Sequence, residues 1–353
     1  KLDDQICGNL CRCTGYRPIR DATRQIAGLL PDDGFKAAVG EGCELTKGLT
    51  FEFASARYAS PTTFEELWDA IDAREQPRFV CGATDLGLDV TQRHVRFPCL
   101  VSVEHLPELH GIRLITGGLS IGAAVPLSDL EAHTTASHPP MARMLRFFGA
   151  RQIKNRATLG GNICNASPIG DTPPVLLAMD ATAIALSRAG ERRIPMDQFF
   201  TGYRQTALAL GEVLARVELP FVPDGARAAA YKVSKRRELD ISAVCAGFYI
   251  RVGDDGLILE ARIAYGGMAA TPKRAQAVET ALVGSPFSEA TFEAAAGAID
   301  ADFAPIDDHR GSAWYRKTVA ENFVRGFFLE ARRPGTVGLS DRPVGTVVVE
   351  VGR

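Results

Sequence analysis

The sequence predicts an α+β protein with more than one domain. Its 353 residues exceed the roughly 100–200 residues of one ordinary domain. Short apolar runs bounded by Gly or Pro are typical of buried strands, and they alternate with segments whose apolar residues recur at helical spacing. The 34 glycines and 20 prolines supply the many turns that such a mixture needs.

Composition narrows the class of protein and its compartment. The net charge of -2 gives no positive excess for nucleic-acid phosphates, and no apolar stretch approaches the ~20 residues of a membrane span. The chain starts at Lys1 without the apolar core of a signal peptide, so we expect a segment that begins inside a domain. Three of the eight cysteines lie within residues 7–13, which favours a metal site in a reducing, cytoplasmic setting over a disulfide framework.

The first elements are expected to be helical. Apolar residues recur at helical spacing over 19–30, and this helix should end near Pro31. Residues 31–50 have scattered glycines and no period, so they are expected to be a linker. A second helix is predicted to run through Ala73, capped by Ser60 or Thr62, with Pro61 near its first turn.

Short strands and helices are expected to alternate through the middle of the chain. Strands are predicted at 78–82, 99–103 and 118–125, and a helix at 141–149. A helix or turn at 175–179, a strand at 183–186 and a strand at 212–219 follow, with a boundary near residue 226.

The last third predicts a separate unit built on a hairpin. Strands over 244–252 and 257–265 are joined through Asp255 and Gly256, a pair that suits the positive backbone angles of a tight turn. Residues 273–300 and 312–331 have helical spacing. The unit should therefore be a sheet with two or three helices packed on it.

A first chemical signal is the pair Cys11 and Cys13. Two thiolates one residue apart can face one iron–sulfur cluster from a turn, and Cys7 is a possible third ligand. A [2Fe–2S] cluster needs four cysteines, so these residues alone leave ordinary buried thiols open. The six histidines show no zinc spacing, and no Gly-x-Ser-x-Gly elbow of a hydrolase is present.

Two glycine-containing segments suggest a nucleotide-like ligand. In residues 79–87 a strand runs into a turn whose Thr84 and amides can meet an anion, although an ordinary tight turn fits as well. The segment matches neither the Rossmann nor the P-loop pattern. In residues 158–162 adjacent glycines let the backbone approach a pyrophosphate or a flavin, and Asp171 can accept from a hydroxyl. A merely structural glycine-rich loop is the alternative there.

These motifs resemble those of the molybdenum hydroxylases. The string from Gly8 to Pro18 is similar to the end of the helical [2Fe–2S] domain in xanthine dehydrogenases, aldehyde oxidases and carbon monoxide dehydrogenases. Residues 148–171 resemble the flavin-binding segment of the same family, whose FAD domain shares the fold of vanillyl-alcohol-oxidase (PCMH-type) flavoproteins. The resemblance covers nearly the whole chain and is greatest to the FAD/iron–sulfur small subunit of bacterial xanthine dehydrogenases.

The resemblance implies a division of the chain. Residues 1–30 would be the C-terminal part of the all-α [2Fe–2S] domain and 31–50 a linker. Residues 51–226 would form a two-lobed FAD-binding domain. Residues 227–340 would form an α/β sandwich as in the C-terminal domain of CO dehydrogenase flavoproteins, and 341–353 a tail.

The resemblance also implies site residues. Cys11 and Cys13 would ligate the cluster together with an upstream Cys-x-x-Cys, whereas Cys7 would not. The expected FAD-binding residues are Phe79, Val80, Cys81, Gly82, Ala83, Thr84, Asp85, Leu86, Phe148, Thr158, Leu159, Gly160, Gly161, Asn162, Asp171, Tyr203, Leu214 and Lys232. Residues 79–86 would wrap the pyrophosphate and 158–162 the phosphates and the ribityl chain.

The remaining expected roles concern the flavin ring. Phe148 would pack on or near the isoalloxazine, Tyr203 would lie where a nicotinamide docks, and Lys232 would favour negative charge on the reduced ring. Asp171 would bind a further polar group of the cofactor. Leu214 is equally an ordinary core residue, and the basic residues 235–237 can equally be a solvated turn.

The implied function is electron transfer, since no site on this chain would itself oxidise a substrate. Hypoxanthine or xanthine would become urate, in purine catabolism, at molybdopterin on a large partner subunit, in a heterotetramer with two copies of each subunit. Electrons would pass through [2Fe–2S] clusters to FAD and leave as hydride to NAD+. The alternatives are the FAD subunit of an aldehyde oxidase or CO dehydrogenase-type enzyme, a stand-alone FAD oxidoreductase, or a ferredoxin-like carrier without turnover.

Overall fold

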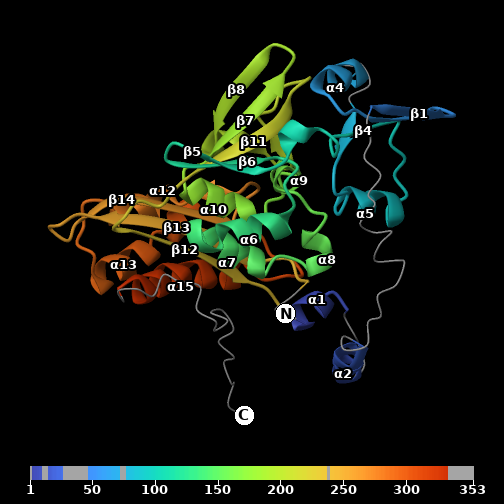
Figure 1. Ribbon diagram of the computed structural model, residues 1–353. Helices are drawn as coiled ribbons and strands as arrows, with labels where there is room; N and C mark the ends of the chain where they lie inside the picture. The colour runs from blue at the N-terminus through green and yellow to red at the C-terminus, as the bar shows by residue number, and fades with distance from the viewer. Residues whose placement is uncertain (1, 10–14, 27–46, 72–76, 237–238, 333–353) are drawn as a thin grey trace.

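The computed structural model describes residues 2–9, 15–26, 47–71, 77–236 and 239–332 (Figure 1). Within these ranges the strands form three larger sheets and one small hairpin. None of the helices in these ranges is long and apolar enough to cross a membrane. We call residues 47–109 the first lobe, residues 112–222 the second lobe and residues 226–332 the C-terminal unit.

Two helices precede the lobes. Helix α1 (Leu2–Ile6) is followed by α2 (Tyr16–Ile26), which begins three residues before the predicted start at Ile19. Helix α1 contacts α8 (Arg151–Lys154) of the second lobe, where Gln152 Nε2 donates to the carbonyl oxygen of Gln5 at 2.9 Å. Cys11, Cys13 and most of the predicted linker lie outside the described residues.

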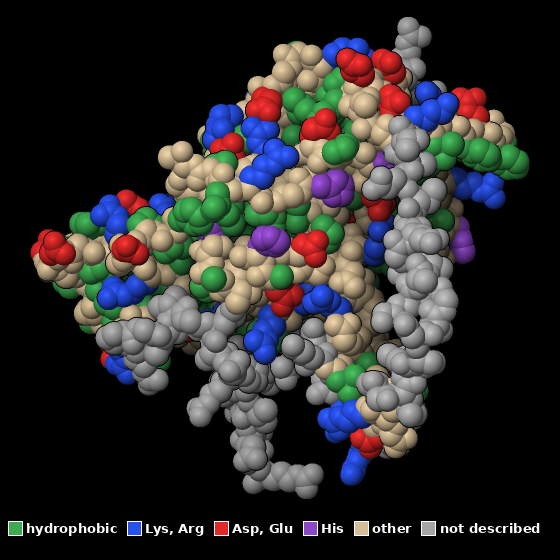
Figure 2. Space-filling view, viewed as in Figure 1, with side chains coloured by type: hydrophobic (Ala, Val, Ile, Leu, Met, Phe, Trp, Pro, Cys, Tyr) green, Lys and Arg blue, Asp and Glu red, His purple; other side chains and the backbone are tan. Residues whose placement is uncertain are grey.

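The first lobe is a mixed sheet with the strand order β1-β2-β4-β3. Its elements are β1 (Leu49–Phe53), β2 (Ala56–Ser60), α4 (Phe64–Ala70), β3 (Arg78–Val80), α5 (Leu86–Thr91), β4 (Cys99–Ser102) and the 3-10 helix η1 (Pro107–Leu109). The predicted strands at 78–82 and 99–103 are confirmed as β3 and β4. The first two residues of strand β1 fall within the predicted linker, and its apolar side chains lie at the exposed tip on the right of Figure 2.

The predicted cap of the helix that follows β2 is wrong. Helix α4 begins at Phe64, and its cap is Thr63, whose hydroxyl accepts from the amide of Glu66 at 3.2 Å. Pro61 keeps the residue before it extended, so Ser60 remains in β2. Thr62 is a donor instead, with its amide 2.8 Å from Glu66 Oε2. The helix ends at Ala70 rather than Ala73.

The second lobe is an antiparallel sheet with the order β5-β6-β11-β7-β8, drawn at the top of Figure 1. Its strands are β5 (Ile112–Ile115), β6 (Gly118–Gly122), β7 (Thr182–Ser187), β8 (Gly190–Pro195) and β11 (Val213–Pro220), and the small hairpin is β9 (Phe200–Gly202) with β10 (Gln205–Thr206). Its helices, besides α8, are α6 (Leu127–Ser137), α7 (Pro139–Arg146), α9 (Leu159–Cys164), α10 (Thr172–Ala178) and α11 (Met196–Phe199). The predicted strands are confirmed. Residues 175–179, expected as a helix or a turn, lie mostly in α10, and the helix expected at 141–149 runs from Pro139 to Arg146.

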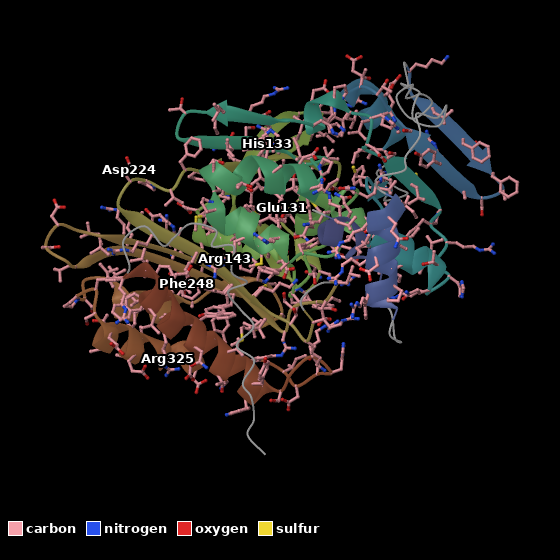
Figure 3. All side chains as sticks on the ribbon, turned by 60° about the horizontal axis from the view of Figure 1, so that its bottom comes forward. Glu131, His133, Arg143, Asp224, Phe248 and Arg325 are labelled. Carbon is pink, nitrogen blue, oxygen red and sulfur yellow. The ribbon has the colours of Figure 1, made fainter. Side chains whose placement is uncertain are left out.

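The C-terminal unit is an antiparallel sheet, β12-β13-β14-β15, covered by helices. Its elements are β12 (Ala226–Val233), β13 (Val244–Val252), β14 (Ile258–Gly266), β15 (Lys273–Arg274), α12 (Gln276–Leu282), α13 (Glu289–Ala296), α14 (Ile299–Asp302) and α15 (Ala313–Ala331). The predicted hairpin is confirmed, with Gly256 at a φ of 79° in its turn. Phe248 on β13 stacks on Phe327 of α15 at 5.1 Å, in the region that Figure 3 labels.

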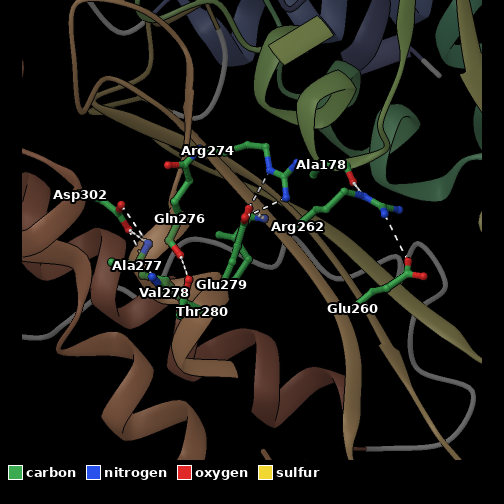
Figure 4. Close-up of polar contacts among 11 residues, drawn as sticks. Ala178, Glu260, Arg262, Arg274, Gln276, Ala277, Val278, Glu279, Thr280 and Asp302 are labelled. Carbon is green, nitrogen blue, oxygen red and sulfur yellow. Dashed lines mark hydrogen bonds and ion pairs between the residues drawn. The ribbon is translucent and has the colours of Figure 1, made fainter. Parts of the chain in front are cut away.

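Helix α10 joins the second lobe to the C-terminal unit. All seven of its residues are buried, between α7 on one side and β13 and β14 on the other. A Cβ placed on Gly247 of β13 would lie 2.4 Å from the carbonyl oxygen of Pro174, so the helix backbone rests directly on the strand. Arg262 Nε on β14 donates to the Ala178 carbonyl at 2.9 Å (Figure 4). One continuous core therefore spans both parts.

The contact at Gly247 gives a stability prediction. Gly247→Ala should lower the free energy of unfolding by roughly 1–3 kcal/mol, since the added methyl group forces α10 away from β13. Gly326→Ala is the matched control, because Gly326 lies in α15 with no heavy atom within 4 Å of the added Cβ. That change should stabilise the protein by about 0.5–1 kcal/mol. Urea denaturation measures both, and a Gly247→Ala protein as stable as the parent would contradict the prediction.

Candidate functional site

A cavity of about 640 Å³ lies between the first and second lobes, with lining residues from both. All but four of the predicted FAD-binding residues line it. They are Phe79, Val80, Cys81, Gly82, Ala83, Thr84, Asp85, Leu86, Phe148, Thr158, Gly160, Gly161, Asn162 and Leu214. The fold thus brings together three segments that are far apart in the sequence.

A close backbone contact at Gly82 sets the shape of this cavity. A Cβ on Gly82 would lie 1.5 Å from the carbonyl oxygen of Arg156, a distance that no side chain can tolerate. The same stretch is held by an ion pair between Arg156 and Glu104, 2.7 Å apart. The turn after β3 therefore rests on the backbone that leads into Thr158.

The turn after Gly82 presents unused backbone donors. The amides of residues 83–86 donate to no described residue, and Ala83 has a φ of 58° that turns the chain sharply. Successive amides in such a turn form a concave donor surface that suits an anion. This geometry agrees with the predicted contact between residues 79–86 and a pyrophosphate.

The sequence suggested a loop at the glycine pair 160–161, but the pair is helical. It lies in the first turn of α9, where the Thr158 hydroxyl accepts from the amide of Gly161 at 3.1 Å. The amide of Gly160 donates to Ala123, and a Cβ on Gly160 would lie 2.7 Å from that residue. Gly160 is therefore required for packing, while Gly161 faces the cavity with its own amide already bonded.

Asn162 supplies a side-chain donor on the same wall. Its Oδ1 accepts from the Thr172 hydroxyl at 2.6 Å, which fixes the orientation of the amide group. Its Nδ2 has no partner among the described residues, and Asn162 lines the cavity. A ligand hydroxyl or phosphate oxygen is the matching acceptor.

Four predicted residues do not line the cavity. Leu159 is fully buried in the core, and Tyr203 is 63% exposed at the tip of the β9–β10 hairpin, beside the lining residue Arg204. Asp171 and Lys232 form an ion pair, with Nζ 2.6 Å from Oδ2 and side chains only 6% and 5% exposed.

The buried pair supports the cavity wall from behind. Ser242 also donates to Asp171, at 2.5 Å, so the carboxylate is satisfied on both oxygens by protein groups. Asp171 directly precedes Thr172, which orients Asn162. Burial, and then the charge of Asp171, raises the pKa of the neighbouring Cys245 thiol. In this arrangement the pair acts on the cavity through Thr172 and Asn162.

The sequence interpretation missed several lining residues. The charged ones are Arg78, Asp89, Arg204 and Glu212, and neutral ones include Ala123, Ile153, Cys164, Asn165, Thr206 and Leu208. Arg204 could have been found, since it directly follows the predicted site residue Tyr203. Glu212 gave no local signal because it precedes an ordinary strand. Leu214 is both a core residue and a lining residue, so neither of its two interpretations excludes the other.

The thiols and the expected cluster need separate mention. Burial and the nearby charge of Glu104 raise the pKa of Cys81, so this lining thiol is neutral near pH 7. Within the described ranges no group of three or more His, Cys, Asp and Glu side chains could hold a metal ion. Cys11 and Cys13 lie outside those ranges, and their role as ligands stays a prediction.

Comparison with known protein families gives two matches. Residues 51–222 match the FAD binding domain in molybdopterin dehydrogenase, and residues 229–331 match the CO dehydrogenase flavoprotein C-terminal domain. Together they cover more than three quarters of the chain. The predicted combination of a FAD-binding domain and this C-terminal domain is confirmed.

Curated relatives include xanthine dehydrogenases. The enzyme from Emericella nidulans is 29% identical over 100% of this chain, and xanthine dehydrogenase/oxidase from Gallus gallus is 28% identical over 93%. A nicotinate hydroxylase from Emericella nidulans is 34% identical over 78% of the chain. The chain spans 30% of the length of the first two relatives and 22% of the third.

Solved structures show the same fold at full subunit length. A chain of carbon monoxide dehydrogenase from Hydrogenophaga pseudoflava superposes with a TM-score of 0.72 and 28% identity, covering 78% of this chain and 96% of that chain. A chain of quinoline 2-oxidoreductase from Pseudomonas putida 86 gives 0.71 and 27%, with 80% and 98% covered. With its cavity built from the matched segments, the chain belongs to the FAD-binding flavoproteins of the molybdenum hydroxylase family.

Proposed function

We propose that this chain is the electron-transfer subunit of a molybdenum hydroxylase, and that the whole enzyme is a xanthine dehydrogenase. Electrons from purine oxidation on a molybdopterin-binding partner subunit would reach FAD through [2Fe–2S] clusters and leave to NAD+. The observation that carries the proposal is the cavity between the lobes, whose wall is built from the segments that the family motifs single out. The xanthine dehydrogenases among the relatives support the choice of substrate.

The residues of the cavity fit FAD. Its volume of about 640 Å³ is within the usual ~300–1,000 Å³ of a cofactor site. The unused amides of residues 83–86 suit the pyrophosphate, Asn162 Nδ2 suits a hydroxyl, and Phe148 offers an apolar surface to an aromatic ring. Bound FAD would supply the exchange between single-electron and hydride chemistry that side chains cannot perform.

The protein's own groups bind and orient rather than react. The Gly82 turn presents donors, and Thr172 holds Asn162 in one orientation for a ligand oxygen. The Asp171–Lys232 pair keeps both charges compensated inside the protein. No acid or base is needed on this chain for oxidation of a purine, since that reaction is assigned to the partner subunit.

The entry side for electrons is proposed to be the N-terminal segment. A Cβ on Gly8 would meet Gln152 Oε1 at 2.4 Å, so Gly8 lies against α8, and Gln152 is four residues beyond Phe148. Cys11 and Cys13 are proposed as ligands of the cluster that passes electrons to FAD. The proposal further includes a cytoplasmic heterotetramer with two copies of each subunit.

The FAD subunit of another molybdenum hydroxylase is the second candidate. The nicotinate hydroxylase has the higher identity, at 34%, and the structural relatives act on carbon monoxide and quinoline as their names state. Under our proposal the substrate of this enzyme binds the partner subunit, so the cavity on this chain does not identify it. Substrate tests on the assembled enzyme distinguish these candidates.

Substitution at Gly82 tests the cofactor site. Gly82→Ala should weaken FAD binding roughly 10–100-fold, because relieving a clash with the Arg156 carbonyl costs about 1–3 kcal/mol of loop displacement. Gly87→Ala in α5 is the control, with no heavy atom within 4 Å of its added Cβ. The measurement is the flavin released per chain after dialysis against a range of FAD concentrations. Equal FAD affinity in the two variants would refute this assignment of the cavity.

The assembled enzyme tests the reaction. The native complex should show flavin and iron–sulfur absorption and form NADH from NAD+ with xanthine or hypoxanthine. Flavin absorption alone would favour a stand-alone FAD oxidoreductase, and the absence of both chromophores would favour a carrier without turnover. A complex with both chromophores that oxidises nicotinate or quinoline but no purine would overturn the xanthine assignment and leave the electron-transfer role intact.

A further inference from the structure

Arg192 on the outer strand β8 donates three hydrogen bonds, to Glu212 and to Ala207. Its Nε donates to Glu212 Oε1 at 2.8 Å, and one terminal nitrogen donates to Glu212 Oε2 at 2.6 Å. The same nitrogen donates to the carbonyl oxygen of Ala207 at 2.7 Å. One guanidinium thus joins the two ends of the loop that connects β10 to β11.

Glu212 closes the same loop from the inside. Its Oε2 accepts from the amide of Ala209 at 2.7 Å, while its own amide donates to the Ala209 carbonyl at 3.0 Å. Gly211 has a φ of 80°, which lets the chain turn within these four residues. Hydrogen bonds from Arg192 lower the pKa of Glu212, so the carboxylate is charged at neutral pH.

This loop holds the hairpin that lies beside the cavity. Ala207 directly follows β10, and its amide donates to Phe199 at the start of the hairpin. The hairpin tip is Tyr203 and Arg204, of which Arg204 lines the cavity and Tyr203 is exposed next to it. Thr206, Leu208 and Glu212 also line the cavity, so the braced loop is itself part of the wall.

The neighbouring residue Arg193 provides an internal comparison. It forms an ion pair of the same length with Glu218, 2.6 Å, on the same strand and with similar exposure. Neither Arg193 nor Glu218 lines the cavity or bonds to the 207–212 loop. A role common to every ion pair of this sheet would affect both arginines equally.

We propose that Arg192 and Glu212 are positioning residues that hold Tyr203 and Arg204 at the edge of the cavity and thereby set the affinity for the nicotinamide acceptor. The acceptor part rests on the proposed function. We call the contacts of Arg192 and Glu212 with the 207–212 loop the brace, and this part of the proposal rests only on the hydrogen bonds described above. Removing Arg192 leaves Glu212, 10% exposed in its side chain, without a cationic partner and releases the Ala207 carbonyl.

The kinetic test uses the FAD-loaded full chain and NADH, which gives one hydride to the flavin and leaves as NAD+ while the flavin takes a proton from solvent. Without an acceptor to reoxidise the flavin, each chain is reduced once, and stopped-flow absorbance follows that reduction. Arg192→Met should raise the NADH concentration that gives the half-maximal rate about tenfold and change the limiting rate of flavin reduction less than about twofold, because a disordered loop weakens docking before it affects chemistry. Arg192→Lys should lie between the two, since an ammonium lacks the planar fork that reaches Glu212 and Ala207 together. Arg193→Met should leave both constants unchanged.

Limited trypsin digestion tests the brace without any cofactor or activity. The Arg204–Gln205 bond should be cut about tenfold faster in Arg192→Met than in the parent, since cleavage follows the population of locally open states. Mass spectrometry identifies that bond among the other sites, and Arg193→Met should be cut at the parental rate.

The outcomes separate the brace from the acceptor assignment. Equal cleavage in the Arg192 and Arg193 variants would overturn the proposal, as would a lower limiting rate of flavin reduction at an unchanged half-maximal NADH concentration. If NADH does not reduce the flavin of the parent chain, the assignment of NAD+ fails. The digestion then decides on the brace alone.

Discussion

The cavity depends on one close approach between two backbones. Where the turn after β3 crosses the chain before α9, only the hydrogen atoms of Gly82 fit against the Arg156 carbonyl. This contact fixes the positions of the two segments that line the cavity relative to each other. Residues 83–86, whose amides donate to no described residue, line the cavity directly after this contact. The ion pair between Arg156 and Glu104 holds the other segment in place. A steric limit, rather than an attractive contact, sets the distance between the two lobes at this point.

The sequence predicted the elements well because their signals are local. Helical spacing and the bounding glycines and prolines placed β3, β4, β7, β11, α10 and the β13–β14 hairpin, and the motif resemblance placed nearly half of the lining residues. Local signals cannot say which partner a side chain meets. Asp171 and Lys232 are separated by sixty residues and satisfy each other. Position 160 must be glycine because a side chain there would clash with Ala123, which only the folded structure brings near. Glu212 became visible only through Arg192, a residue on another strand.

Two ion pairs near the cavity differ in their exposure to solvent. The Asp171–Lys232 pair lies behind the wall with Ser242, where desolvation is offset only by close, fully hydrogen-bonded geometry. The pair at the edge, Arg192 with Glu212, is half in solvent and contributes mainly by organising backbone. One fixes the orientation of a side chain, and the other fixes the course of a loop.

Helix α10 has a consequence for how the protein comes apart. It lies within the segment that matches the FAD-binding domain, yet it packs mainly against strands of the C-terminal domain, and Arg143 on α7 pairs with Glu330 on α15. A boundary drawn by sequence similarity at residues 222–229 therefore does not divide the molecule into two independently stable halves. Separating the two parts there would expose a buried helix that is apolar apart from Thr172 and would leave Asp171 without its counterion. Because one buried core contains residues of both matched domains, we expect them to unfold together in one transition.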